Sequence, residues 1–395
     1  MTSSKSFSNV PAGASQQPTP FELHINEQKL QDFKTLLKLS PIAKETYENL
    51  REDGEFGVTR KWMLDAKQYW QESFDWRKEE DRINSLPNFR TQIKDDDGNS
   101  YDIHFAALFS SKPDAIPIAF LHGWPGSFLE FVPLLELLQK KYTPDDLPYH
   151  IIVPSLPGYA LSSDPPHDKD WTTIDIGRTI HKLMLSLGFG SSGYLVQGGD
   201  IGSLVSRVIA ARYDECKGMH LNFMLNNGIQ DKASEDDKLT EQEEKGLKRM
   251  EKFFVKGRAY AHEHGTKPAT IGFAMASSPV AQLAWIGEKF LAWSDPNTTP
   301  SLNTILTDIT LYWLTDCFPT SIYTYRQDKK MDQVNKPTGY SYFPYELCPI
   351  PQAWAAKTCD LVFFKSHDKG GHFAALERPE TLWADVEGYV KIAWE

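Results

Sequence analysis

The chain is poor in cysteine and in basic residues. Its 395 residues include four cysteines, whose spacing matches neither a metal-binding cluster nor a dense disulfide framework. We therefore expect reduced thiols and a cytoplasmic location. Acidic residues outnumber lysine and arginine by 53 to 42, and the resulting net charge of −11 argues against a nucleic-acid partner. The cysteines are Cys216, Cys317, Cys348 and Cys359.

Long hydrophobic runs are also missing. No apolar run approaches the ~20 residues of a membrane helix, so the sequence predicts no membrane anchor. Residues 1–20 are rich in Ser, Gln, Pro and Ala, and they lack the basic start and apolar core of a signal peptide. Because such a composition is typical of disorder, we expect residues 1–20 to form a flexible tail.

The chain does contain a long alternation of strand and helix patterns. A hairpin around a Gly turn opens this alternation, and the order that follows is that of a mainly parallel sheet. The fold class is therefore α/β, and a hydrophobic content of 41% is ample for one large core. The strand candidates are Thr91–Lys94, Tyr101–Phe109, Ile116–Leu121, Tyr149–Val153, Tyr194–Gln197, Met219–Leu221 and Leu361–Phe364; the helix candidates between and after them are Phe128–Tyr142, Ser203–Tyr213 and Glu380–Ile392.

Two segments depart from the alternation. Residues 21–90 are helical in character and mix polar with apolar positions, which favours an arm packed on another surface. Residues 226–335 begin with a charged helix and have few strand patterns, which indicates a helical cap inserted into the sheet domain. The core then consists of residues 91–225 and 336–395.

The pentapeptide Gly198-Gly199-Asp200-Ile201-Gly202 lies between a strand candidate and a helix candidate. A strand, a sharp Gly-flanked turn and a helix form the nucleophile elbow of the α/β-hydrolase fold, in which Ser is the usual central residue. Here the central residue is Asp200. A carboxylate attacks saturated carbon and leaves an alkyl ester, so Asp200 indicates hydrolysis of a strained ring or of a carbon–halogen bond. An ordinary N-cap Asp is the alternative interpretation.

An earlier strand-to-helix loop has the sequence His122-Gly123-Trp124-Pro125-Gly126-Ser127, and Trp124 lies 76 residues before Asp200. In α/β-hydrolase folds this loop supplies one backbone N–H of the oxyanion hole, and the residue after the nucleophile supplies the other. We therefore predict that the backbone N–H groups of Trp124 and Ile201 form the hole.

The candidate base is His372, which follows the last strand pattern and two glycines. Its position agrees with the chain order nucleophile, acid, histidine. Three carboxylates compete to orient it. Glu346 is favoured because it lies at the expected carboxyl edge of the sheet, where sites of open α/β sheets are found. Asp368, on the His372 loop, and Asp360, at the far edge, are the alternatives.

These motifs, with Gly371-His372-Phe373-Ala374-Ala375-Leu376-Glu377-Arg378-Pro379, resemble those of the α/β-hydrolase-fold epoxide hydrolases, and most closely the microsomal-type branch with its soluble fungal members. The resemblance runs from about Pro20 to the C-terminus. It implies an epoxide substrate, water as co-substrate, and no metal or organic cofactor. It also implies Asp200 as nucleophile, His372 as base, Glu346 as its partner, and two cap tyrosines that bind the epoxide oxygen. The oligomeric state is not predicted, and a homodimer is one possibility.

Tyr260, in Arg258-Ala259-Tyr260-Ala261-His262-Glu263-His264, matches the first tyrosine motif of the family. Tyr325, in Ile322-Tyr323-Thr324-Tyr325-Arg326, matches the second, but Tyr323 is near enough to compete for the role. Both predicted tyrosines fall in the cap.

Two other classes of function remain. A haloalkane dehalogenase uses the same Asp and His, but it commonly has a Trp directly after the nucleophile, where this chain has Ile201. A non-catalytic binding protein of the same fold would have lost the catalytic set, whereas this chain retains candidates for nucleophile, acid and base. A serine esterase is disfavoured because Asp200 occupies the elbow.

Overall fold

The computed structural model of the protein describes residues 6–225, 234, 237–327 and 333–394. Within these residues nine strands form one sheet in the order β1-β2-β3-β5-β4-β6-β7-β8-β9. The strands are β1 (Thr19–Phe21), β2 (Asn88–Lys94), β3 (Ser100–Leu108), β4 (Ile116–Leu121), β5 (Tyr149–Pro154), β6 (Tyr194–Gly198), β7 (Cys216–Leu221), β8 (Val334–Tyr342) and β9 (Cys359–Ser366).

The sheet changes character at β5. From β1 to β5 neighbouring strands run antiparallel, and from β5 to β9 they run parallel. The central strands β4, β5 and β6 are short and almost fully buried, as expected for strands covered on both faces. The mainly parallel α/β sheet predicted from the sequence is confirmed, and each strand candidate overlaps an observed strand.

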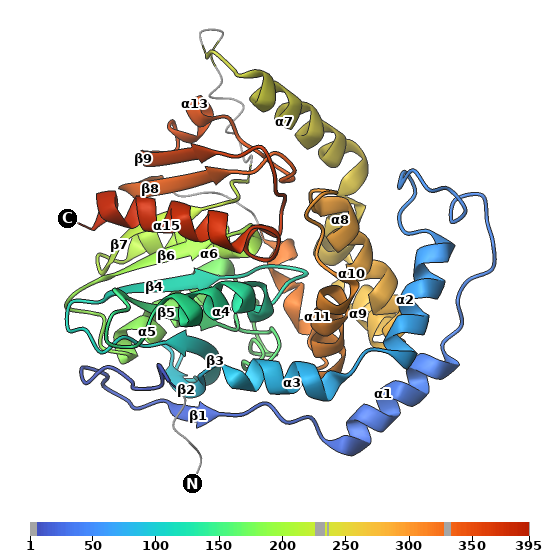
Figure 1. Cartoon of the computed structure of the whole chain (residues 1–395), viewed down its shortest axis with the longest axis horizontal. Helices are drawn as coiled ribbons and strands as arrows, with labels where there is room; N and C mark the ends of the chain where they lie inside the picture. The colour runs from blue at the N-terminus through green and yellow to red at the C-terminus, as the bar shows by residue number, and fades with distance from the viewer. Residues whose placement is uncertain (1–5, 226–233, 235–236, 328–332, 395) are drawn as a thin grey trace.

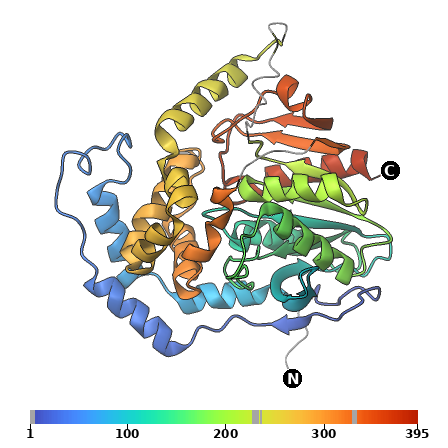
Figure 2. The same ribbon diagram turned by 180° about the vertical axis from the view of Figure 1, so that it is seen from behind.

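Helices cover both faces of the sheet. On one face α4 (Val132–Lys141) packs against α15 (Pro379–Ala393), and on the other α5 (Thr173–Ser186) packs against α6 (Asp200–Arg212). Figure 1 is viewed from the side of α4 and α15, and Figure 2 from the side of α5 and α6. A short turn, η1 (Phe128–Phe131), precedes α4. In this sheet the carboxyl ends of β4, β6, β8 and β9 face the cap.

The cap lies beyond these strand ends (Figure 1). Its described residues form helices and turns, and the strand β8 already begins at Val334, two residues inside the segment assigned to the cap from the sequence. The predicted cap residues 226–233, 235–236 and 328–332 lie outside the described residues. The cap elements are α7 (Glu241–Lys252), the π-helical turn η3 (Phe253–Gly257), α8 (Ala259–Thr266), α9 (Pro268–Ala276), α10 (Pro279–Trp293), α11 (Leu302–Leu314), α12 (Phe318–Ser321) and η4 (Tyr323–Arg326).

The arm contains α1 (Glu27–Leu39), α2 (Arg60–Glu72) and α3 (Trp76–Ser85), and it runs along cap and core in Figure 1. The boundary predicted at residue 90 is wrong in one respect, because it falls inside β2. A bidentate pair joins arm to core: Arg82 Nε and a terminal nitrogen donate to Glu136 at 2.7 and 3.0 Å. Two four-residue helices lie later in the chain: α13 (Gln352–Ala355) between β8 and β9, and α14 (Ala374–Glu377) between β9 and α15.

The flexible tail expected over residues 1–20 needs correction for its described part. Phe7 is buried, and its carbonyl accepts a hydrogen bond from the N–H of Phe109 at 3.0 Å. The Ser15 N–H donates to the carbonyl of Ser186 at 2.9 Å. The buried Phe7 ring and these backbone hydrogen bonds therefore hold the segment against the core, although its composition alone suggests disorder. Residues 1–5 lie outside the described part.

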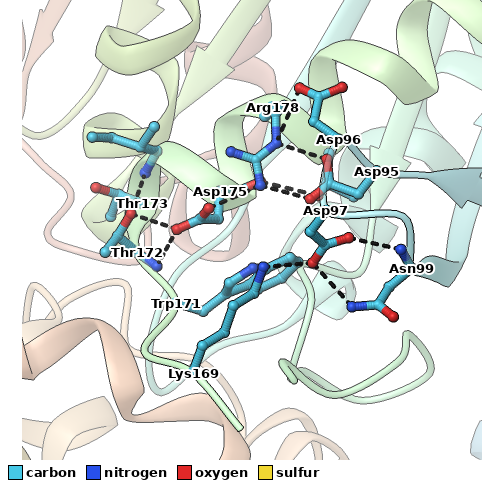
Figure 3. A network of polar contacts seen from close by, with 12 residues as sticks. Asp95, Asp96, Asp97, Asn99, Lys169, Trp171, Thr172, Thr173, Asp175 and Arg178 are labelled. Atoms are coloured by element: carbon cyan, nitrogen blue, oxygen red, sulfur yellow. Dashed lines mark hydrogen bonds and ion pairs between the residues drawn. The ribbon is translucent and has the colours of Figure 1, made fainter. Parts of the chain in front are cut away.

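A polar network joins the turn of the β2–β3 hairpin to the start of α5 (Figure 3). Arg178 donates to both carboxylate oxygens of Asp95 at 2.6 Å and to Asp175 at 2.8 Å. The Asp95 side chain is fully buried. Burial raises the pKa of Asp95, but hydrogen bonds from Arg178 and from the Asp96 backbone, with the charges of Arg178 and Lys182, together bring that pKa below its ordinary value.

Two findings bear on the environment of the chain. All four cysteines are buried thiols outside any disulfide bond. Among the described residues no single helix is long and apolar enough to span a membrane; α9 and α10 reach that length and apolarity only when taken together, across a bend of 117°.

Candidate active site

The elbow between β6 and α6 holds Asp200 at the first residue of the helix, with φ of +43°. The helix therefore begins three residues earlier than the sequence suggests. A positive φ is costly for a residue with a side chain, so the surrounding structure must impose it. Gly202 allows the close packing that does so, since a Cβ atom there would lie 2.0 Å from the carbonyl oxygen of Leu121.

The Asp200 carboxylate already occupies the predicted oxyanion hole. The Trp124 N–H donates to Asp200 Oδ1 at 2.9 Å, and the Ile201 N–H also donates to the carboxylate. Burial raises the pKa of Asp200, but hydrogen bonds from His372 and these backbone groups lower it further than burial raises it. The nucleophile is therefore ionised. The approach is close, because a Cβ atom at Gly123 would lie 2.3 Å from Oδ1.

His372 lies between two carboxylates. Its Nε2 is 3.4 Å from Asp200 Oδ2, and its Nδ1 donates to Glu346 Oε1 at 2.6 Å. The side chains of His372 and Glu346 are almost completely buried. Burial disfavours the imidazolium, but Glu346 and Asp200 more than offset burial and hold the pKa of His372 well above its ordinary value. Asp200, His372 and Glu346 thus form one hydrogen-bonded chain.

Of the three carboxylates that competed for His372, the structure places Glu346 against it. Glu346 follows β8 at the carboxyl edge of the sheet, where Tyr345 pairs with Gly371 in an isolated bridge. Asp360 and Asp368 are both exposed. This bridge brings the Glu346 loop and the His372 loop side by side, although 26 residues separate the two side chains in sequence.

The two cap tyrosines face the same space. Tyr260 in α8 and Tyr325 in η4 line the cavity that Asp200 also lines, and their side chains hydrogen bond to each other. The Tyr260 ring stacks on Trp124 at 5.2 Å. Burial, reinforced by Asp200, raises the pKa of both hydroxyls well above 10, so both are protonated at neutral pH.

Tyr323 is used differently. Its hydroxyl donates to the carbonyl of Pro157 at 3.0 Å, and its ring is not part of the cavity wall around Asp200. Two residues along a tight helical turn point in different directions, which is why Tyr323 and Tyr325 separate. His122 is also structural: its Nε2 accepts from the N–H of Leu156 at 3.0 Å, and burial lowers its pKa to about 4.

The cavity has a volume of about 640 Å³, which suits a small organic molecule. Asp200 lies on its core side, and the cap supplies the opposite wall from η3, α8 and Tyr325. Apolar side chains form much of the lining, namely Ile201, Leu204, Phe223, Leu225, Phe253, Phe254 and Leu347. The polar lining residues include Asp200 and the two tyrosines, together with Arg258, His262, Thr266 and Gln327.

Three residues that the sequence analysis did not single out contact this site. Arg249 in α7 donates through Nε to the carbonyls of Tyr345 and Glu346 at 3.0 and 3.1 Å. Glu377 binds backbone N–H groups on both sides of His372. Burial raises the pKa of Glu130, which packs against Gly126, to about 8. Most of their partners are backbone groups, which the residue types do not indicate; Glu377 stands in the motif that follows His372, but the motif alone does not give it a role.

Metal binding has no obvious place here. Across residues 6–225, 234, 237–327 and 333–394, no group of three or more His, Cys, Asp or Glu side chains is arranged to hold a metal ion.

The fold and site define a class: an α/β hydrolase with a carboxylate in the nucleophile elbow and a cap that carries two tyrosines. Comparison with known proteins agrees. The family model for the alpha/beta hydrolase fold matches residues 116–379, and that for the epoxide hydrolase N terminus matches residues 18–131.

Individual relatives identify the family more specifically than the two family models do. The solved epoxide hydrolase of Aspergillus niger is 49% identical, with a TM-score of 0.93 over 99% of this chain and 100% of that one. Epoxide hydrolase 1 of Oryctolagus cuniculus is 31% identical over 94% of this chain and 88% of its own length. Juvenile hormone epoxide hydrolase of Bombyx mori is 25% identical, with a TM-score of 0.84 over 96% of this chain and 95% of that one. The chain therefore belongs to the epoxide hydrolase family.

Proposed function

We propose that the protein converts epoxides to vicinal diols through an alkyl ester on Asp200. One observation carries this mechanism: Asp200 lies between the Trp124 N–H and His372, in a cavity that Tyr260 and Tyr325 also line. A carboxylate, a base and two neutral phenols are the groups that such a hydrolysis needs. Family membership supplies the reaction class, and the geometry supports the roles of the residues.

In the first half-reaction Asp200 attacks one epoxide carbon, and the ring carbon–oxygen bond breaks. Oδ1 is held by the Trp124 N–H, so we assign the attack to Oδ2, the oxygen that faces His372. The ring oxygen leaves as an alkoxide and takes a proton from Tyr260 or Tyr325. A phenol can supply that proton although its pKa is raised, because an alkoxide is far more basic.

Ester formation then prepares His372 for the second half-reaction. In the free enzyme the negative charge of Asp200 is one of the groups that raise the pKa of His372. Alkylation removes that charge, so the pKa of His372 falls and the neutral imidazole can act as a base. His372 takes a proton from water, and the hydroxide attacks Cγ of Asp200.

The oxyanion that forms at Oδ1 already has the Trp124 N–H as a donor, and the Ile201 N–H also binds this carboxylate. Glu346 stabilises the imidazolium and fixes the ring. Collapse of the intermediate breaks the Cγ–Oδ2 bond, and the departing diol oxygen takes the proton held by His372. The proton of the new carboxyl group returns to the tyrosinate, which restores the carboxylate and the phenol.

A panel of aryl and alkyl epoxides and of bromoalkanes, assayed for diol and for bromide, tests this function. We expect diol from epoxides, no bromide, and loss of diol formation in Asp200→Asn. Bromide release without diol would make the enzyme a dehalogenase instead.

A cytoplasmic location and a homodimeric state are further proposals, of which the first is motivated by the small number and the spacing of the cysteines. Cell fractionation and light scattering of the purified protein test them.

A further inference from the structure

The loop that carries His372 is held by an unusual set of acceptors. Four consecutive backbone N–H groups, from Gly370 to Phe373, all have partners outside the loop. The N–H of Gly371 donates to Glu377 Oε2, and that of Phe373 donates to Glu377 Oε1, both at 3.0 Å. The N–H of Gly370 donates to Asp295 Oδ2 at 2.9 Å, and that of His372 to the carbonyl of Trp293 at 3.0 Å.

Glu377 therefore holds the residues on both sides of the base. It also reaches the cap segment that follows α10, because its Oε2 accepts from the N–H of Asp295 and from Thr298 Oγ1, both at 2.9 Å. One buried carboxylate thus accepts four hydrogen bonds, two from the His372 loop and two from the cap. A carboxylate in that position joins the two segments directly.

The packing leaves little freedom for this joint to move. A Cβ atom at Gly371 would lie 2.6 Å from the carbonyl oxygen of Trp293, so the loop and the cap segment touch backbone to backbone. The Trp293 ring also meets the His372 ring edge-on at 5.1 Å. A shift of the loop relative to the cap would therefore move the imidazole relative to Asp200.

We propose that Glu377 is a positioning residue for His372, which holds the base against the cap at the place needed for ester hydrolysis. This inference rests on the proposed two-step function. Ring opening needs the Asp200 carboxylate and the tyrosines but not His372 as a base, whereas ester hydrolysis needs the imidazole in place. Loss of Glu377 therefore acts on one half-reaction only.

The test compares wild type with Glu377→Gln, which keeps the shape but puts an amide NH₂ among N–H donors. Rapid-quench measurements with an epoxide that wild type hydrolyses give the rates of ester formation and decay. We expect formation within about twofold of wild type and decay slower by about 10- to 100-fold, the effect of a misplacement near 1 Å. The ester should then accumulate in the steady state.

Glu380→Gln is the matched control, because Glu380 is exposed at the start of α15 and lies three residues away. It should leave both rates unchanged. If Glu377→Gln does not fold, Asp295→Asn decides, since it replaces the charged acceptor of the Gly370 N–H by a neutral amide and should also slow only ester decay.

Decay at the wild-type rate in the folded variant, or an equal slowing of both steps, would overturn the role of Glu377. Failure of the proposed function looks different, because wild type itself would then form no ester with any epoxide.

Discussion

The two oxygens of Asp200 have different surroundings, and this difference can be tested. Oδ1 accepts from the Trp124 N–H, while Oδ2 faces His372. If Oδ2 attacks the epoxide and water later attacks Cγ, an enzyme oxygen enters the first diol. With excess enzyme in heavy-oxygen water, we expect the first-turnover diol to carry an unlabelled new oxygen. The mass of that diol is the measurement. A heavy label in the new oxygen of the first-turnover diol would mean direct attack by water.

The tyrosine pair predicts a second residue-scale result. Tyr260→Phe and Tyr325→Phe should each slow ester formation by about 10- to 100-fold, the usual range for a lost proton donor at a developing alkoxide. Their hydroxyls hydrogen bond to each other, and both stabilise the same negative charge that develops on the epoxide oxygen. The effects of the two changes should therefore not add. Stopped-flow tryptophan fluorescence follows ester formation in the single and double variants.

Tyr323→Phe is the control for this pair, since it removes a hydroxyl that binds Pro157 and not the cavity. It should leave the rate of ester formation near wild type. If Tyr323→Phe is the damaging change and Tyr325→Phe is silent, the second tyrosine has been assigned to the wrong residue.

Glu346 should matter only after the ester has formed. Glu346→Gln removes the charge that stabilises the imidazolium, so we expect an intact burst of ester and slower diol release, by up to ~10⁴-fold. Rapid quench measures both steps. Asp360→Asn and Asp368→Asn are controls, because both carboxylates are exposed and should leave turnover unchanged. Normal turnover in Glu346→Gln would remove Glu346 from the mechanism.

The sequence predicted the local parts of the site better than the distant ones. The elbow around Asp200 and the Trp124 loop are each a run of a few consecutive residues. Their Gly and Pro residues indicate sharp turns, so both loops could be recognised from the sequence. The pairing of Glu346 with His372 depends on a bridge between two loops, so the sequence left Asp360 and Asp368 open. Glu377 is missed because its partners are backbone N–H groups of the His372 loop and of Asp295 and the hydroxyl of Thr298, which no pattern of residue types indicates.

At the scale of elements, the network between the β2–β3 turn and α5 makes a stability prediction. Asp95→Asn leaves Arg178 with one strong partner fewer, at a site where the Asp95 side chain is fully buried. We expect a loss of about 2–3 kcal/mol, below the ~3–5 of a fully buried pair because Arg178 is partly exposed. Urea unfolding measures it. Asp96→Asn, at a side chain 73% exposed, should cost under ~1 kcal/mol.

The same network sets a pH dependence. The pKa of Asp95 is lowered in the folded state, so its stabilising contribution is present above the unfolded pKa of ~3.9 and is lost as pH falls through the folded value. The difference in stability between wild type and Asp95→Asn should therefore be constant near neutrality and shrink below about pH 4. A difference that stays the same down to pH 3 would show that the charge of Asp95 is not the cause.

Elements with strong periodicity or long apolar runs could be predicted from sequence, whereas short and polar ones could not. The central strands and α1 follow their patterns closely. The sequence gives no separate prediction for β1, which has three residues, or for α3, whose sequence is mostly charged. Both exist because tertiary pairing supports them: β1 pairs with β2, and α3 buries Trp76 and Ile83.

At the scale of the whole molecule, arm, cap and core interlock. The arm contributes β1 and part of β2 to the core sheet, and its helices also pack on the cap (Figures 1 and 2). Trp70 in α2 is a link of this kind: its indole N–H donates to Thr310 of the cap helix α11 at 2.9 Å, and its ring packs on Phe33 of α1. Because the cap also carries Tyr260 and Asp295, its position relative to the core sets the active site.

We therefore predict that arm, cap and core unfold together. Trp70→Ala should destabilise the protein by about 3–5 kcal/mol, as expected for a buried aromatic ring reduced to a methyl group. Calorimetry should show one transition, shifted to lower temperature but not split, because the three parts share buried surface. Leu39→Ala, at a residue 72% exposed in α1, is the control and should shift it little. A separate early transition in Trp70→Ala, with the core melting at the wild-type temperature, would show that the arm and cap are an independent unit.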